Sequence, residues 1–215
     1  MLPRKREYAR WFTPKIEVDL CGHATLASAH VLFTHLGYAG DEIRFLSRYS
    51  GMLKAFRDKE GIMLDFPAET VRKVPLPKSL AEGLRQRPIE TYRGKTKILA
   101  VFKSEKDIER MAPDFHKLIK VRTSGVIVTA KGDTVDFVSR YFGPWVGVPE
   151  DPVTGSAHTI LTPYWARKLG KTELVAIQLS KRRGRLRCLL SGNRVKITGK
   201  ATTYLVGEMM LDTGR

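Results

Sequence analysis

The sequence is poor in cysteine, in long apolar runs and in acidic side chains. Its two cysteines, Cys21 and Cys188, are too few for a disulfide framework or a cluster of thiolate ligands, which favours a reducing compartment. No run approaches the roughly 18 apolar residues of a membrane span, and no apolar segment follows the basic residues 1–10 as in a secretory signal. We therefore expect a cytoplasmic protein with no membrane partner and no metal site.

The deficit of acidic groups leaves a formal net charge of +16, from 38 basic and 22 acidic side chains. Such a balance is compatible with nucleic acid, an anionic surface or an acidic substrate as partner. The densest basic run, residues 181–187, partly alternates along a predicted strand, as on a solvated sheet face. No recognised nucleic-acid-binding module accompanies the charge, so nucleic acid is not the expected partner.

One pattern occurs twice in the chain, at residues 20–37 and 150–170. In each copy a polar turn leads into an apolar helix, and two glycines with the same spacing bracket that helix, Gly22 with Gly37 and Gly155 with Gly170. The separation between Gly22 and Gly155 also relates further pairs in the same order: Ser47 and Ser180, Gly51 and Gly184, Leu53 and Leu186, Ile62 and Val195, Leu64 and Ile197. The sequence is therefore predicted to contain a duplicated domain.

The start of each duplicated helix is a candidate anion-binding element. In the second copy Thr154 and Ser156 are placed to cap the first turn, and Gly155 lets the backbone approach a ligand closely. A helix N-terminus carries N–H groups without partners and a partial positive charge. It therefore attracts a carboxylate or a phosphate.

Strands are predicted to surround the two helices. The first helix, about 23–36, is apolar nearly all round, so we expect it to be buried. Helices do not alternate with strands, which favours antiparallel strands over a parallel sheet. The fold class is therefore α+β, with two pseudo-symmetric domains, each of antiparallel strands wrapped round one central helix. Strands are predicted at 43–47, 52–57, 61–66, 97–102, 126–128, 135–138, 174–179, 185–190, 194–198 and 201–206, a turn at 140–144, and short helices near 78–86, 105–111 and 114–119.

The two copies are unequal in length. The second copy has a long stretch of chain before the segment 140–144 (RYFGP), whereas the first has only residues 1–9 before the matching segment 10–14 (RWFTP). We therefore expect a truncated first domain with its connection at residues 1–90 and a second domain at 91–215. A helix that lacks covering strands exposes apolar surface, so we expect a homodimer or higher oligomer.

The duplicated segments also carry a resemblance. Three segments resemble the PhzF-like phenazine-biosynthesis family: residues 10–14, residues 17–25 (EVDLCGHAT) and residues 150–158 (EDPVTGSAH), the last followed by Pro163-Tyr164-Trp165. Gln178, Ser180 and Arg182 fit the later strand motif of that family. The resemblance implies a fold like diaminopimelate epimerase, with the active site between two helix N-termini. It also implies an isomerase without metal or organic cofactor, and the best-known member moves a proton on trans-2,3-dihydro-3-hydroxyanthranilate.

By motif match, the resemblance implies that His23, Asp151 and Ser156 are catalytic and that Gly22, Thr154 and Gly155 bind substrate. An aspartate before the helix can relay a proton, and a histidine titrates near neutral pH. Ser156 with neighbouring N–H groups can hold a carboxylate, so a small carboxylate is the expected partner. Each of the three side chains also has an ordinary structural interpretation: a turn residue for Asp151, a cap for Ser156 and a first-turn residue for His23.

One departure from the family favours a second interpretation. The principal acid–base glutamate of the family lies in a Ser-Glu-Thr segment upstream of the segment 10–14, and neither Glu7 nor Glu17 matches it. We therefore expect isomerase activity that is impaired by loss of this glutamate. The alternative is a non-catalytic protein that keeps the interdomain site for small anions. A cofactor-independent racemase would need two opposed thiols, and the second copy has Thr154 where the first has Cys21.

Overall fold

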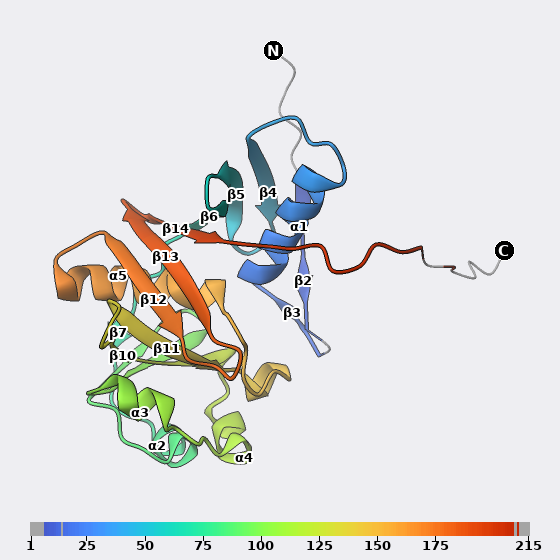
Figure 1. Cartoon of the computed structure of the whole chain (residues 1–215). Helices are drawn as coiled ribbons and strands as arrows, with labels where there is room; N and C mark the ends of the chain where they lie inside the picture. Colours follow the sequence, from blue (N-terminus) through green and yellow to red (C-terminus); the bar gives the residue numbers. More distant parts are fainter. Residues whose placement is uncertain (1–6, 14, 209, 211–215) are drawn as a thin grey trace.

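The computed structural model describes residues 7–13, 15–208 and 210. Two helices of unequal exposure, α1 (Gly22–Thr34) and α5 (Gly155–Leu169), pack against one large mixed sheet (Figure 1). The order of its strands is β1-β4-β5-β6-β14-β13-β12-β11-β10-β9-β8-β7. Strands from the two halves of the chain therefore form one continuous ladder, in which β6 meets β14.

The large sheet contains β1 (Glu7–Ala9), β4 (Glu42–Ser47), β5 (Gly51–Asp58), β6 (Gly61–Pro67), β7 (Arg72–Lys73), β8 (Glu90–Arg93), β9 (Lys97–Val101), β10 (Gly125–Lys131), β11 (Phe137–Phe142), β12 (Glu173–Gln178), β13 (Gly184–Ser191) and β14 (Arg194–Gly199). A small separate sheet is formed by β2 (Trp11–Phe12) and β3 (Glu17–Val18). The remaining elements are α2 (Lys78–Leu84), α3 (Glu105–Glu109), α4 (Phe115–Leu118) and the 3₁₀ turns η1 (Ile119–Val121) and η2 (Pro144–Val146).

The internal duplication is visible in the element boundaries and in the strand pairing. Three pairs of elements begin at positions related by the offset between Gly22 and Gly155: α1 and α5, β5 and β13, and β6 and β14. In the antiparallel ladder between β6 and β14, Leu64 lies directly opposite its sequence equivalent Ile197. The two halves of the chain are therefore related by a pseudo-two-fold arrangement about this pair of strands.

The helix α5 is packed as a central helix. It contacts β12, β13 and β14, and most of its residues are buried. The Trp165 ring stacks on Phe137 with a centroid distance of 5.9 Å, and its indole N–H donates a hydrogen bond to Thr129 Oγ1 at 3.0 Å. These contacts hold α5 against the sheet and so fix the position of its N-terminus.

The helix α1 is only partly buried: its apolar sequence predicted a buried helix, whereas the shorter first copy predicted a helix that lacks covering strands. Only Gly22, Thr25, Ala29 and Phe33 are buried, because α1 packs on β5, β6 and the start of α5 along one side. Val31 remains 43% exposed on α1. Part of the free side is followed by the chain after β14, where Thr203 Oγ1 lies 2.9 Å from His30 Nε2 (Figure 1). Coverage of the rest by a second copy stays a prediction.

Three details of the sequence-based strand assignment were wrong. Residues 140–142 are the end of β11 rather than a turn, and residues 201–206 form no strand because both edges of β14 already pair with β6 and β13. Three strand pairs, β1–β4, β9–β10 and β11–β12, are parallel. The last two are joined through helices, which gives the chain the length that a parallel crossover needs. The domain boundary predicted near residue 90 stays a prediction. Pro14, the last residue of the segment 10–14, lies outside the described residues.

Candidate active site

The two central helices begin at glycines that touch each other. A Cβ atom added to Gly22 would lie 2.7 Å from Gly155 Cα, and one added to Gly155 would lie 2.9 Å from Gly22 Cα. Real Cβ atoms do not approach backbone carbons so closely, since favourable carbon contacts begin near 3.5 Å. Glycine at both positions therefore allows the N-termini of α1 and α5 to meet.

The meeting of two helix starts concentrates hydrogen-bond donors. The first N–H groups of a helix have no partner within that helix, and the aligned peptide dipoles add a partial positive charge. Neither cap residue, Cys21 in α1 or Thr154 in α5, supplies a side chain to these N–H groups. The expectation that the Thr154 hydroxyl caps α5 was therefore wrong, because this hydroxyl donates instead to Asp151 Oδ2. The helix starts remain open to an anionic ligand.

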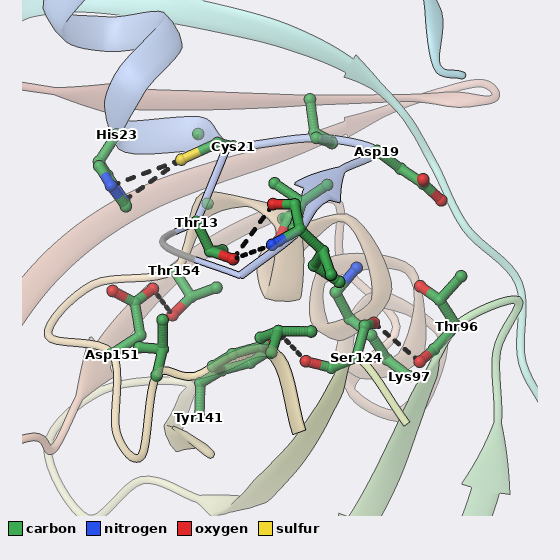
Figure 2. Close-up of a pocket in the computed structure, with 18 of the residues that line it drawn as sticks. Thr13, Asp19, Cys21, His23, Thr96, Lys97, Ser124, Tyr141, Asp151 and Thr154 are labelled. Carbon is green, nitrogen blue, oxygen red and sulfur yellow. Dashed lines mark hydrogen bonds between the residues drawn. The ribbon is translucent and has the colours of Figure 1, made fainter. Parts of the chain in front are cut away.

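A cavity of about 260 Å³ lies at these helix starts (Figure 2). This size suits a small ligand, since pockets for drug-sized molecules occupy roughly 300–1,000 Å³. The predicted site residues all line it: Gly22, His23, Asp151, Thr154, Gly155 and Ser156. The two copies of the duplicated turn thus contribute to a single site, although the roles of these residues stay predictions.

The turn before α5 is held rigidly by Gln178, a fully buried residue at the end of β12. Its side-chain carbonyl accepts a hydrogen bond from the Thr154 amide at 2.8 Å. Its side-chain amide donates to the Asp151 carbonyl at 2.7 Å and to Thr154 Oγ1 at 3.1 Å. One side chain therefore fixes both ends of the turn that presents the Asp151 carboxyl group to the cavity.

A serine braces each copy of the turn in the same way: Ser47 is the last residue of β4, and Ser180 lies just after β12. Ser180 Oγ donates to the Pro152 carbonyl at 2.7 Å, and Ser47 Oγ donates to the Asp19 carbonyl at 3.4 Å. Both the donors and the acceptors are sequence equivalents under the offset of the duplication. The duplication therefore extends to the hydrogen bonds that support the site.

Asp151 has the electrostatic properties of a proton-transfer group. It is only partly exposed, and burial raises the pKa of its carboxyl group above the ordinary value. The hydrogen bond from Thr154 and the nearby His23 both oppose this rise in pKa. A carboxyl group whose pKa lies closer to neutrality is a better proton acceptor and donor at working pH.

His23 stands beside Cys21 at the start of α1. Its Nε2 atom lies 3.4 Å from Cys21 Sγ. The pKa of His23 is raised, first by this contact with Cys21 and then by attraction to Asp151. The imidazolium form is therefore favoured more than for a free histidine, so His23 can supply a proton or a positive charge at the rim of the cavity.

Glu17 also lines the cavity, but its carboxylate forms an ion pair with Arg10. Both of its carboxylate oxygens accept hydrogen bonds from the Arg10 guanidinium, each at 2.9 Å. This pairing holds the pKa of Glu17 below its ordinary value. Glu17 is therefore a poor candidate for the proton acceptor.

Sequence reasoning did not single out three further residues that line the cavity, Lys97, Ser124 and Tyr141. The Tyr141 hydroxyl donates to the Ser124 carbonyl at 2.8 Å, and burial raises the pKa of this phenol. Lys97 opens β9, a strand in which every residue is buried. A lysine next to the apolar run Ile-Leu-Ala-Val was the available signal, because lysine is almost never buried without a specific reason.

The racemase interpretation finds no support in the position of the second thiol. Cys188 is buried in β13, where burial raises the pKa of its thiol to about 12, and it does not line the cavity. Within the part of the chain that the structure describes, no group of three or more His, Cys, Asp or Glu side chains could hold a metal ion. No helix among the same residues is long and apolar enough to cross a membrane.

Comparison with known proteins gives consistent matches over nearly the whole chain. Residues 3–207 match the family described as phenazine biosynthesis-like protein. An uncharacterized isomerase of Pseudomonas aeruginosa is 50% identical over 202 residues, which is 94% of this chain and 77% of that protein. The crystal structure of a PhzF-family phenazine biosynthesis protein from Enterococcus faecalis has a TM-score of 0.86 and 43% identity, covering 95% of this chain and 78% of that one. The structure of a predicted epimerase from Pseudomonas aeruginosa has a TM-score of 0.63 and 17% identity, covering 92% of this chain and 77% of that one. This likeness shows the fold alone.

Proposed function

Because the chain belongs to the phenazine biosynthesis-like family, we propose that it is an isomerase that moves a proton on a small carboxylate substrate without an organic cofactor. Relatives described as isomerases support this reaction class. The observation that carries the proposal is the meeting of two helix N-termini beside Asp151, whose carboxyl pKa is raised. Donors for a substrate anion and a group able to exchange protons are thus combined in one cavity.

In this proposal the substrate carboxylate binds the N–H groups at the starts of α1 and α5, with the Ser156 hydroxyl beside them. Asp151 takes a proton from a substrate carbon, so one C–H bond breaks and negative charge moves toward the substrate oxygens. The helix N-termini stabilise that charge as it develops, as preorganised donors do in other enzymes. The proton then returns to a different carbon from Asp151, or His23 supplies one, and a new C–H bond forms while the double bond shifts.

The test is proton exchange in D₂O. The protein is incubated with trans-2,3-dihydro-3-hydroxyanthranilate, and NMR follows deuterium uptake and migration of the double bond. We expect Asp151→Asn to slow turnover by about 10²–10⁴-fold, the usual contribution of a general acid–base group. Asp133→Asn is the matched control, because Asp133 is an exposed aspartate that does not line the cavity.

Two results would overturn the proposal for this substrate. Turnover that survives Asp151→Asn unchanged would remove Asp151 from the reaction. Binding of the substrate without any exchange in the unmodified protein would instead support the alternative, a non-catalytic protein that holds small anions at the helix starts.

A further inference from the structure

The cavity contains a buried cation that the proposed reaction does not use. Lys97 is 9% exposed and lines the cavity together with Thr96 and Ser124. Among the residues that the structure describes, no hydrogen bond or ion pair within ordinary distance limits reaches its ammonium group. A buried charge without a partner is strongly unfavourable, and a lysine held in this way inside a cavity is a candidate for binding a ligand.

The acidic groups nearest to Lys97 do not neutralise it. Glu69 and Asp19 raise the pKa of Lys97 by attraction, but burial outweighs them and the net pKa is lowered. Glu69 Oε1 already accepts a hydrogen bond from the Lys95 amide at 2.7 Å. The ammonium group therefore keeps its donors for a molecule in the cavity.

The position of Lys97 defines the second end of the site. In Figure 2, Lys97 and Thr96 lie at one end of the cavity, whereas His23, Asp151 and Thr154 lie at the other. The helix N-termini occupy the Asp151 end, because Thr154 directly precedes α5. A lysine side chain and a pair of helix N-termini therefore stand at opposite ends of one small cavity.

We propose that Lys97 binds a second anionic oxygen group of the substrate, so that the site selects small molecules with two acidic groups, such as cyclic dicarboxylates. This inference rests on the proposed function for the first carboxylate, which binds at the helix starts. Lys97 contacts the far group and holds the intervening carbons beside Asp151. It is a binding and specificity residue, and it takes no part in the transfer of the proton.

The experiment compares two probes by isothermal titration calorimetry: benzoate, with one carboxylate, and isophthalate, with two. The variant is Lys97→Met, which keeps the length of the side chain and removes its charge. The control is Lys95→Met, which removes an exposed lysine from the same segment. We expect isophthalate to bind the unmodified protein about 10–100-fold more tightly than benzoate, the gain typical of a charge-assisted hydrogen bond.

Lys97→Met is expected to abolish this advantage while the affinity for benzoate stays within about twofold, and Lys95→Met to change neither. The advantage should also decline as pH rises through the lowered pKa of Lys97, because only the ammonium form attracts the second carboxylate. Lys97→Met should raise Tm, since it replaces an unpaired buried charge by an apolar group of similar shape.

An isophthalate advantage that persists in Lys97→Met, or that is absent from the unmodified protein, would overturn the inference. A fall in the Tm of Lys97→Met would do the same, because it would show that Lys97 serves the fold. The proposed function fails separately: if benzoate does not bind but isophthalate binds through Lys97, the helix-start site is wrong and the Lys97 site stands.

Discussion

The contact between Gly22 and Gly155 makes a sharp prediction for Gly22→Ala. The added methyl carbon would lie 2.7 Å from Gly155 Cα, 3.1 Å from its nitrogen and 3.3 Å from its carbonyl carbon. All three atoms belong to the backbone, so no side chain can rotate away, and α1 and α5 must separate by roughly 1 Å to restore ordinary contact. Overpacking of this kind costs about 1–3 kcal/mol, and the better helix propensity of alanine offsets at most about 1 kcal/mol.

The expected net loss for Gly22→Ala is therefore about 1–2 kcal/mol in the free energy of unfolding, or a fall in Tm of roughly 2–8 °C for a chain of this size. Urea unfolding and differential scanning calorimetry measure these quantities. Gly207→Ala is the control, because a Cβ at Gly207 meets no atom within 4 Å. Gly155→Ala should cost a similar amount, and the double variant should cost less than the sum because both methyl groups strain the same contact. Full additivity of the two substitutions, or a stability equal to that of the control, would refute the claim that the two helix starts touch.

Three further predictions concern residues that support the site. His158 is fully buried, and burial lowers its pKa to about 4, whereas a histidine of the unfolded chain takes up a proton below about pH 6.5. The free energy of unfolding, measured with urea, should therefore fall by about 2 kcal/mol between pH 7 and pH 4.5. An equal fall in His158→Asn would contradict this assignment to His158. Gln178→Leu leaves the Thr154 amide and the Asp151 carbonyl without their partner and should cost about 3 kcal/mol in the same assay; a loss below about 1 kcal/mol would mean that the turn is held by other contacts. Arg183 adopts a left-handed backbone with φ of 54°, which is unfavourable for a residue with a Cβ atom, so Arg183→Gly should raise the free energy of unfolding by about 1 kcal/mol, measured by calorimetry. A decrease would show that the exposed ion pair of Arg183 with Glu109 contributes more than the relief of backbone strain.

Much of the fold could be predicted because the duplication constrains it. The constant offset between the two copies correctly related the starts of the two central helices, of β5 and β13, and of β6 and β14. The pattern failed where the environment, rather than the sequence, decides. The helix α1 has the composition of a buried helix, yet its exposure depends on which strands reach it. Residues 201–206 have strand-like composition, but β14, the strand that they follow, already pairs on both edges with β6 and β13.

The candidate site could be predicted only in part. Residues of the two turns were found because they occur in recognisable segments next to helix starts. Lys97 was missed because it comes from β9, far along the chain, and only the fold brings it to the same cavity. The role of Gln178 was missed for a related reason: its identity fitted a motif, but its three hydrogen bonds to the turn depend on the position of β12.

The most direct test of the central claim is an NMR titration of the backbone amides with benzoate. If α1 and α5 form one anion site, the amide signals of Gly22 and Gly155 will shift together and follow one binding curve with a single Kd. The signals of Gly37 and Gly170, which lie at the opposite ends of the same helices, should not move. Shifts confined to one of the two helix starts, or two curves with different Kd values, would contradict a shared site.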